Sequence, residues 1–340
     1  MFNDFINFKN VTILGINATI VRGICKVIGT TLTKYKDAPS QNLVRNLIVS
    51  LVQHHPDATF EHLNNVFKSL IAKDLATQSM KTSQAAVIAL GWSLLVATNI
   101  KLESDVAKCE FQKLIEYQCS FYQLGVSSGN IKVSEKCDQL INNFLKQNAE
   151  LVDLYFEKLL QLEPSAGAIM LLSLILVHRV KEHNDNSSLE KNKTKLLDLF
   201  IKALVTVKVK PNAVFIPNCK IILNSITVEE FKAHIFSPLQ RSMLRSPEVV
   251  LQGVGAIVHE LNIDLSDFAI DLGKLLVQNL YTKDDCGRAE AVESLREVSM
   301  KCSSSVAIEI LVKHLFDVFN GSDGKITVAE YRINVLQVKW

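Results

Sequence analysis

Apolar residues recur every three or four positions along nearly the whole chain, which is the spacing of one face of an α-helix. The pattern predicts roughly sixteen short helices, among them those at residues 16–32, 43–52, 63–71, 84–96, 111–124, 133–145, 151–162, 166–180, 195–207, 214–226, 229–244, 248–261, 268–280, 288–302 and 307–319. The strand-like stretch 205–210 is explained equally well by a helix that ends before Pro211. We therefore expect an all-α protein.

Two Ser-Pro pairs in "SPLQRSMLRSPEVV" (237–250) predict interruptions of this helical pattern. Proline has no amide hydrogen and its ring clashes with the preceding turn, so a helix should end near Arg245. Ser246 is then placed to cap the next helix, and Pro247 fits its first position. We interpret both pairs as corners between helices, with an architectural role and no chemistry.

Pairs of predicted helices recur at a spacing near 40 residues, which is typical of HEAT and armadillo repeats. Each pair covers its apolar face only by stacking on the next pair, so the repeats share one continuous core. We expect residues 1–340 to form a single right-handed α-α superhelix of about eight helix pairs, a solenoid without a separate catalytic domain. Such a fold offers a long surface on which partners can bind.

Composition places the chain among soluble globular proteins. Hydrophobic residues make up 48% of the chain and the net charge is +2, which excludes a disordered protein and argues against binding of duplex nucleic acid through bulk charge. The seven cysteines are scattered without a CxxC pair and are expected to be reduced thiols. The most apolar run, 166–177, is too short to cross a bilayer, so we expect a cytosolic protein.

Motifs with possible chemistry each have a simpler interpretation. The stretch "FNGSDGKITVAEY" (319–331) matches part of a calcium-binding loop but lacks oxygen side chains at its first and third positions. His54, His55 and His62 lack the spacing of a zinc site, and "KCSSSV" (301–306) lacks the glycines of a nucleophile elbow. "GVG" (253–255) is explained by close helix packing. We expect no metal, no cofactor and no enzyme activity.

Lysines give the strongest candidate site. Residues 191–210 contain six lysines and one acidic residue, Asp198, and a second basic edge surrounds Arg22 and Lys26. Such strips on a nearly neutral protein suit an RNA backbone or an acidic protein tail, although a charged run is also ordinary for an exposed helix face. The predicted contact residues are Lys191, Lys193, Lys195, Lys208 and Lys210, followed by Arg22 and Lys26.

Several stretches together resemble one known family. These are "ALGWSLLV" (89–96), "KVKPNAVF" (208–215), "MLRSPEVV" (243–250), "IDLSDFAIDL" (263–272) and "KHLFDVFNGSDGKITV" (313–328), in that order. They are similar to the amino-terminal part of the large HEAT-repeat translational activator of the general amino-acid control pathway. The resemblance covers the chain from about Gly23 onward.

The resemblance implies a cytosolic all-α solenoid that binds ribosomes and helps to activate the kinase of translation initiation factor two, alpha subunit, during amino-acid starvation. It also implies that the kinase and an ABC-type partner protein bind segments of the family that lie outside this chain. The chain stops at "VLQVKW" (335–340), where the family continues, so a truncated form is expected. Terminal repeats normally present a polar outer face.

Two other functions compete with a ribosome-associated scaffold. A generic helical-repeat adaptor or transport receptor would bind peptides on its inner helices, but such receptors usually carry repeated Asn and Trp, and this chain has only Trp92 and Trp340. An enzyme is the third alternative, and no constellation of side chains supports one.

Overall fold

The structure is a computed structural model, and it describes residues 17–31, 37–77, 79–81, 83–100, 102–128, 131–206, 215–245, 247–281, 284–322 and 335. The described residues form helices and their connections, without a β-strand among them, which confirms the all-α prediction. The helices are α1 (Ala18–Thr31), α2 (Ala38–His54), α3 (Pro56–Thr77), α4 (Ser83–Ile100), α5 (Asp105–Ser128), α6 (Ile131–Gln147), η3 (Ala149–Leu151), α7 (Val152–Gln161), α8 (Ala166–His183), α9 (Ser187–Thr206), α10 (Phe215–Asn218), α11 (Lys220–Leu223), α12 (Val228–Glu230), η4 (Phe231–Phe236), α13 (Ser237–Arg245), α14 (Pro247–Glu260), η5 (Ser266–Phe268), α15 (Ala269–Val277), η6 (Gln278–Tyr281), α16 (Asp285–Met300) and α17 (Ser305–Asn320).

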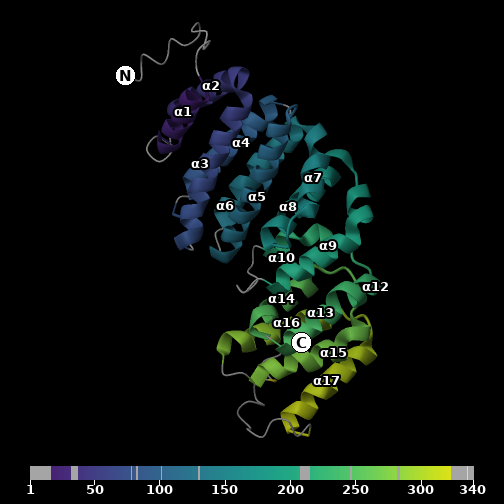
Figure 1. The fold of residues 1–340 in the computed structure, drawn as a ribbon. Helices are drawn as coiled ribbons and strands as arrows, with labels where there is room; N and C mark the ends of the chain where they lie inside the picture. Colours follow the sequence, from purple (N-terminus) through teal and green to yellow (C-terminus); the bar gives the residue numbers. More distant parts are fainter. Residues whose placement is uncertain are drawn as a thin grey trace. The chain divides into compact units, whose positions relative to one another are not determined.

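The helices form two compact units, each with its own packing (Figure 1). Unit 1 comprises residues 1–124 and 132–158, and unit 2 comprises residues 125–131 and 159–340. In both units, successive helices pair and stack as in HEAT-type repeats. The handedness of a superhelix and its extension over the whole chain as a single solenoid stay predictions.

Unit 1 is built on long helices with buried polar ties between them. α3 packs against α1, α2 and α4. The buried Asn64 of α3 donates from Nδ2 to the backbone oxygen of Glu110 in α5, 2.9 Å away and 46 residues further along the chain. Asn148 donates in the same way to the hydroxyl of Thr98, 3.1 Å away and 50 residues earlier. These ties join one helical repeat to the next.

The apolar helix α4 belongs to the core of unit 1. By length and composition it is the one helix among the described residues that qualifies as a membrane span. However, 56% of its apolar window is buried inside the protein, and α4 packs against both α2 and α3. A core helix of a soluble protein passes the same test of length and hydropathy, so α4 fits the helix predicted from residues 84–96.

Unit 2 consists of shorter helices that pack at close range. α14 packs on α16, and α15 packs on α17. Gly255 of α14 allows the close packing of α14 on α16. A Cβ atom at this position would lie 3.0 Å from Ser294 Oγ and 3.4 Å from the Cα atom of Ser294, which is in α16. This close approach confirms the packing role predicted for "GVG" (253–255).

The prediction of a corner at Ser237-Pro238 is wrong. The helix runs without a break from Val228 through the π-helical segment η4 into α13, which ends at Arg245. Pro238 has no amide to donate to the preceding turn, and the wider π turn before it accommodates the missing hydrogen bond and the ring. Ser237 Oγ donates to the backbone oxygen of Lys232 at 3.4 Å.

The second predicted corner is where the sequence places it. α13 ends at Arg245 and α14 begins at Pro247, while Ser246, the predicted cap, lies outside the described residues. Gly321 ends α17 in the left-handed conformation, with φ of 73°. The remainder of the calcium-loop-like stretch lies mainly outside the described residues. Val335, part of the apolar C-terminal sequence, is buried.

Candidate interaction surface

The described part of the lysine-rich segment, residues 191–206, lies on α9, which begins eight residues earlier than its apolar stripe predicts. Asn184 takes the left-handed conformation that ends α8, and the carboxylate of Asp185 accepts a hydrogen bond from the amide of Ser187 at 2.9 Å. Hydrogen bonds from Ser187 lower the pKa of Asp185. The early start places Lys191, Lys193 and Lys195 inside the helix, so helical geometry decides where each side chain points.

Lys191, Lys195 and Lys202 form one exposed stripe, which we call the α9 lysine face. They are four and seven residues apart, so they lie on the same side of the helix, and all three are exposed. The opposite side is apolar and fully buried, with Leu196, Leu197, Phe200, Ala203 and Leu204 in the core of unit 2. The apolar side fixes the orientation of α9, and the lysine side therefore faces solvent.

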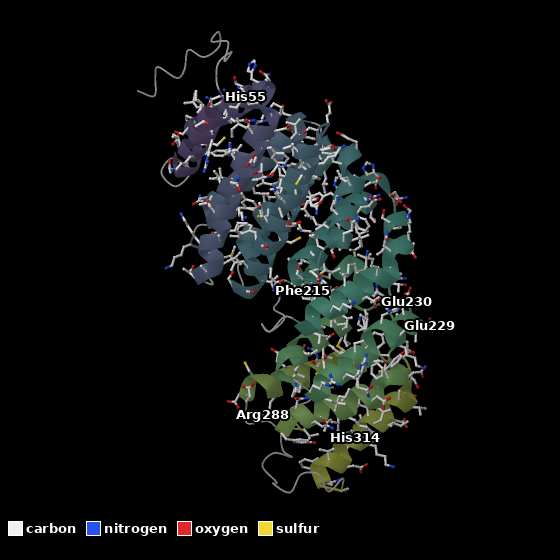
Figure 2. The ribbon with its side chains drawn as sticks, in the orientation of Figure 1. His55, Phe215, Glu229, Glu230, Arg288 and His314 are labelled. Carbon is white, nitrogen blue, oxygen red and sulfur yellow. The ribbon has the colours of Figure 1, made fainter. Side chains whose placement is uncertain are left out.

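Lys193 lies on the inner side of α9, unlike its neighbours. Its Nζ contacts Glu230 Oε2 at 2.9 Å, and only 11% of the lysine side chain is exposed. Burial acts to raise the pKa of Glu230, but hydrogen bonds from Lys193 and from the amide of Thr227 outweigh it, so the pKa is lowered. Glu230 also closes the capping box of α12 with Thr227. In Figure 2, Glu229 and Glu230 are labelled at the margin of the ribbon.

Asp198, the acidic residue predicted within the lysine run, has a partner on the next repeat. Its Oδ1 lies 3.0 Å from His234 Nδ1 in the π-helical segment. Both this pair and the Lys193–Glu230 pair join α9 to the helix formed by α12, η4 and α13. The two carboxylates therefore serve the contact between repeats.

The neighbouring helix adds three exposed cations that sequence reasoning missed. Lys232 lies on η4, and Arg241 and Arg245 are one helical turn apart on α13. The sequence around Lys232 contains Glu229 and Glu230, so no basic run marks it there. A signal did exist, because a repeat period near 40 residues brings Lys232 alongside the lysine run.

The remaining predicted contact residues are not gathered with the α9 lysine face. Arg22 and Lys26 are exposed on α1, which belongs to unit 1. Lys208 and Lys210 lie outside the described residues. The structure thus unites Lys191 and Lys195 in one surface, gives Lys193 a packing role, and assigns Arg22 and Lys26 to a separate helix.

A second polar cluster, at the corners of unit 2, has an architectural role. Asp264 Oδ1 accepts from the amide of Ser303 at 3.0 Å and from the hydroxyl of Ser266 at 2.6 Å. Hydrogen bonds from Ser266 and Ser303 lower the pKa of Asp264 strongly. The amide of Ser304 donates to Ser266 Oγ at 3.0 Å. This corner clamp, Asp264 with Ser266, Ser303 and Ser304, explains "KCSSSV" (301–306) as a junction between repeats.

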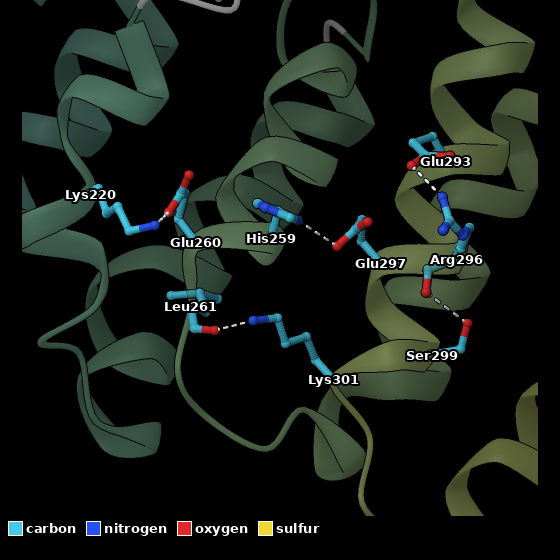
Figure 3. A network of polar contacts seen from close by, with 9 residues as sticks. All are labelled: Lys220, His259, Glu260, Leu261, Glu293, Arg296, Glu297, Ser299 and Lys301. Carbon is cyan, nitrogen blue, oxygen red and sulfur yellow. Dashed lines mark hydrogen bonds and ion pairs between the residues drawn. The ribbon is translucent and has the colours of Figure 1, made fainter.

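Further pairs connect α14 and α16 across the same repeats (Figure 3). His259 Nδ1 lies 3.1 Å from Glu297 Oε2, and Lys301 Nζ donates to the backbone oxygen of Leu261. Lys220 of α11 contacts Glu260 at 3.2 Å. These side chains serve the stacking of helices, and they do not converge on a point where a substrate atom would sit.

Histidine, cysteine and acidic side chains do not form a metal site within the part of the chain that the structure describes. In the predicted histidine cluster, the backbone amide of His55 caps the end of α2. Cys25, Cys119, Cys137 and Cys219 are buried free thiols. Burial raises the pKa of Cys25 and that of Cys219 to about 12, so both are protonated at neutral pH.

Stacked helix pairs of this kind, with polar ties between repeats, define a helical-repeat protein of the HEAT type. Residues 193–326, all of them in unit 2, match the family model described as "Stalled ribosome sensor GCN1 N-terminal". The chain is 31% identical over 318 residues to the stalled ribosome sensor GCN1 of Mus musculus and 31% identical over 322 residues to that of Homo sapiens. The resemblance stated from the sequence is confirmed, and the chain is related to the amino-terminal region of these sensors.

The relatives are much longer than this chain. The mouse and human alignments cover 93% of the chain but 12% of each relative. The protein ILITYHIA of Arabidopsis thaliana is 25% identical over 322 residues, which are 92% of this chain and 11% of that protein. No solved structure gives a significant match to the chain.

Proposed function

We propose that this chain is a ribosome-associated scaffold module in translational control. The observation that carries the proposal is the similarity of 93% of the chain to proteins described as stalled ribosome sensors. The α9 lysine face supports it, because it offers cations to a polyanionic particle on the part of unit 2 where the family model begins.

In this proposal, docking takes place at several points of the helical scaffold. Lys191 and Lys195 make the main contact, and the predicted residues Lys208 and Lys210 extend it along the chain. Arg22 and Lys26 on α1 make a second contact. Lys193 is left out of the contact set, because its ammonium group is held by Glu230.

The proposal describes a binding module in the cytoplasm and assigns no catalytic step to it. The polar contacts of Asp264, His259 and Lys220 hold neighbouring helices together. The kinase of initiation factor two and the ABC-type partner remain predictions for the longer relatives.

Sedimentation with purified ribosomes over a series of salt concentrations tests the proposal. The unaltered chain should co-sediment at low salt and dissociate as salt rises, because cation–phosphate contacts release counterions. Lys191→Glu with Lys195→Glu should weaken co-sedimentation by about tenfold. Lys274→Glu with Lys313→Glu is the charge-matched control, since both lysines are exposed in unit 2 on other helices.

A generic adaptor for protein partners is the alternative function. Such an adaptor would bind through apolar anchors in well-packed pockets. Its binding would change little with salt and would not depend on Lys191 or Lys195. Absence of the unaltered chain from the ribosome pellet at every salt concentration would rule out the proposed function and favour this alternative.

A further inference from the structure

α17 packs on α15 through one side, and the two helices lie next to each other in unit 2 (Figure 1). Leu311, Leu315 and Val318 form this side and are buried. Leu311 fits against Gly273 of α15, where an added Cβ atom would collide with Leu311 Cδ1. This contact fixes the rotation of α17 about its own axis, and it therefore decides which side chains of α17 point into solvent.

The outward side of α17 exposes large apolar side chains. Val306, Ile310 and Phe316 are 60%, 48% and 57% exposed, and helical spacing keeps them on the side turned away from the core of unit 2. Among the described residues, no other helix exposes more than two large apolar side chains. A group of exposed apolar side chains of this kind marks a surface that binds another protein.

Two opposite charges lie within this apolar surface. Glu309 and Lys313 are exposed, and helical spacing places both of them nearly opposite the buried Leu311. Within the part of the chain that the structure describes, neither side chain takes part in an ion pair or a hydrogen bond. Both charges are therefore available to a binding partner. We define the outer face of α17 as Val306, Glu309, Ile310, Lys313 and Phe316.

The outer face of α17 is complementary to itself in an antiparallel arrangement. Val306 and Phe316 lie five residues before and after position 311, and Glu309 and Lys313 lie two residues before and after it. Two copies of α17 that pack antiparallel around this position bring Glu309 of each copy level with Lys313 of the other. Val306 and Phe316 meet in the same way. Each contact therefore forms twice, as two-fold symmetry requires.

We propose that the outer face of α17 binds the same face of a second copy of this chain, antiparallel, in a two-fold symmetric dimer. A second copy is favoured over a different protein because the face carries both members of its own charge pair. A contact through one helix per copy buries less than the roughly 1,200–2,000 Å² of a stable interface, so we expect a reversible dimer that forms at micromolar concentrations. The proposed ribosome contact lies on other helices, so this inference goes beyond the proposed function.

Sedimentation velocity of the full chain, over about 1 to about 100 μM, tests the inference. The dimer fraction of the unaltered chain should rise with concentration. Glu309→Lys alone and Lys313→Glu alone each place like charges across the contact and should weaken dimerisation about tenfold or more. Glu309→Lys with Lys313→Glu restores opposite charges and should return dimerisation to within about threefold of the unaltered chain. Lys181→Glu, an exposed position on α8 of unit 2, is the control for Lys313→Glu and should change dimerisation less than about twofold.

Three outcomes decide against the inference. An unaltered chain that stays monomeric at every concentration would assign the outer face to another segment of the chain or to a different protein. Dimerisation that persists unchanged in Glu309→Lys and in Lys313→Glu would place the contact on another surface. A loss in both single variants without recovery in the double variant would exclude the antiparallel arrangement.

Two further measurements separate the dimer contact from folding and from ribosome binding. Circular dichroism should show unchanged helix content in all variants, because the altered side chains are exposed. Each copy carries its own α9 lysine face, so monomeric Lys313→Glu should co-sediment with ribosomes as the unaltered chain does. Failure of the dimer contact would therefore leave the proposed function in place, and failure of the proposed function would leave the dimer contact in place.

Discussion

The two units solve the problem of joining one repeat to the next in different ways. In unit 1 the ties are buried, as with Asn64 and Glu110, which are 1% and 4% exposed. In unit 2 they lie largely at the surface, as with the side chains of Lys220 and His259, which are 62% and 66% exposed. In unit 1, the residues joined are 46 apart in the tie between α3 and α5 and 50 apart in the tie between α4 and Asn148, which follows α6. In unit 2 they are 36 to 40 apart.

The difference shows what each kind of tie contributes. A buried polar group that loses its partner keeps its full desolvation penalty, so the ties of unit 1 enforce one register strongly. A surface ion pair contributes between nothing and about 1 kcal/mol. Unit 2 instead relies on close helix packing, and its outer side chains remain available for binding.

The largest effect is expected from the buried tie in unit 1. Asn64→Ala removes the donor to Glu110 and should lower the free energy of unfolding by about 2–3 kcal/mol, because it leaves the buried glutamate short of a partner. Urea unfolding followed by tryptophan fluorescence checks this. In a Trp340→Phe background, the buried Trp92 of α4 reports on unit 1 only.

An effect almost as large is expected where unit 2 packs most closely. Gly255→Val should destabilise the chain by about 1–3 kcal/mol, because the side chain would enter space held by Ser294. Gly23→Val on α1 is the control, since a Cβ atom there meets nothing within 4 Å. It should be neutral or slightly stabilising, because valine favours helix more than glycine does. Thermal unfolding of both variants, followed by circular dichroism, compares their stabilities. An equal loss of stability in the two variants would contradict the packing role of Gly255.

Two aspartates should show opposite dependence on pH. In unit 2, hydrogen bonds from Ser266 and Ser303 lower the pKa of Asp264. The ionised carboxylate therefore stabilises the fold above the unfolded-state pKa of about 4, and this contribution is lost as the pH falls below that value. Asp264→Asn should destabilise the chain at neutral pH, and the deficit should shrink in acid.

In unit 1, burial raises the pKa of Asp138, although the hydroxyl of Tyr122 donates to it. The folded state holds its proton more tightly than the unfolded state, so this group lowers stability as the pH rises above about 4. Asp138→Asn keeps an acceptor for Tyr122 and should leave stability at neutral pH unchanged or higher. Urea unfolding midpoints of Asp264→Asn and Asp138→Asn, measured at acid and neutral pH, check these two predictions. If the midpoints of both variants change with pH in the same direction, the predictions are contradicted.

The smallest effects separate two neighbouring lysines. Lys193→Gln removes the contact with Glu230 and should cost up to about 1 kcal/mol of stability, with little change in binding to ribosomes. Lys195→Gln should leave stability within about 0.5 kcal/mol and weaken binding to ribosomes. Thermal unfolding and co-sedimentation with ribosomes, measured on the same two variants, separate these roles. Lys193→Gln with the larger loss of binding would reverse the assignment.

Helical spacing predicted most of the fold, because each apolar stripe requires a partner helix to cover it. At 229–244 this spacing correctly predicted one helix, whereas the corner predicted from Pro238 was wrong, because a π turn takes up a residue that a regular α-helix excludes. The early start of α9 was missed because Ser187–Thr194 is polar apart from Leu189, and the hydrogen bond from the amide of Ser187 to Asp185 at its start is not visible in the apolar pattern.

The candidate surface was predicted in part. Lys191 and Lys195 are on the outer face, and the same helical spacing would have placed Lys193, two residues from each, on the other side. Lys232 and Arg241 escaped notice because local charge counts average them with Glu229 and Glu230. In the folded protein, Glu230 contacts Lys193, while Lys232 and Arg241 are exposed to solvent. The sequence alone does not separate these residues in this way.

The corner clamp also limits how the chain can be altered. Asp264 lies in an exposed loop, which would ordinarily suit the insertion of a tag, a cleavage site or a fused domain. Its carboxylate, however, accepts hydrogen bonds from its own loop and from the loop 39 residues later. Lengthening either loop would therefore break the hydrogen bonds that hold the two loops together. Insertion tolerance there should follow the hydrogen bonds and not the solvent exposure.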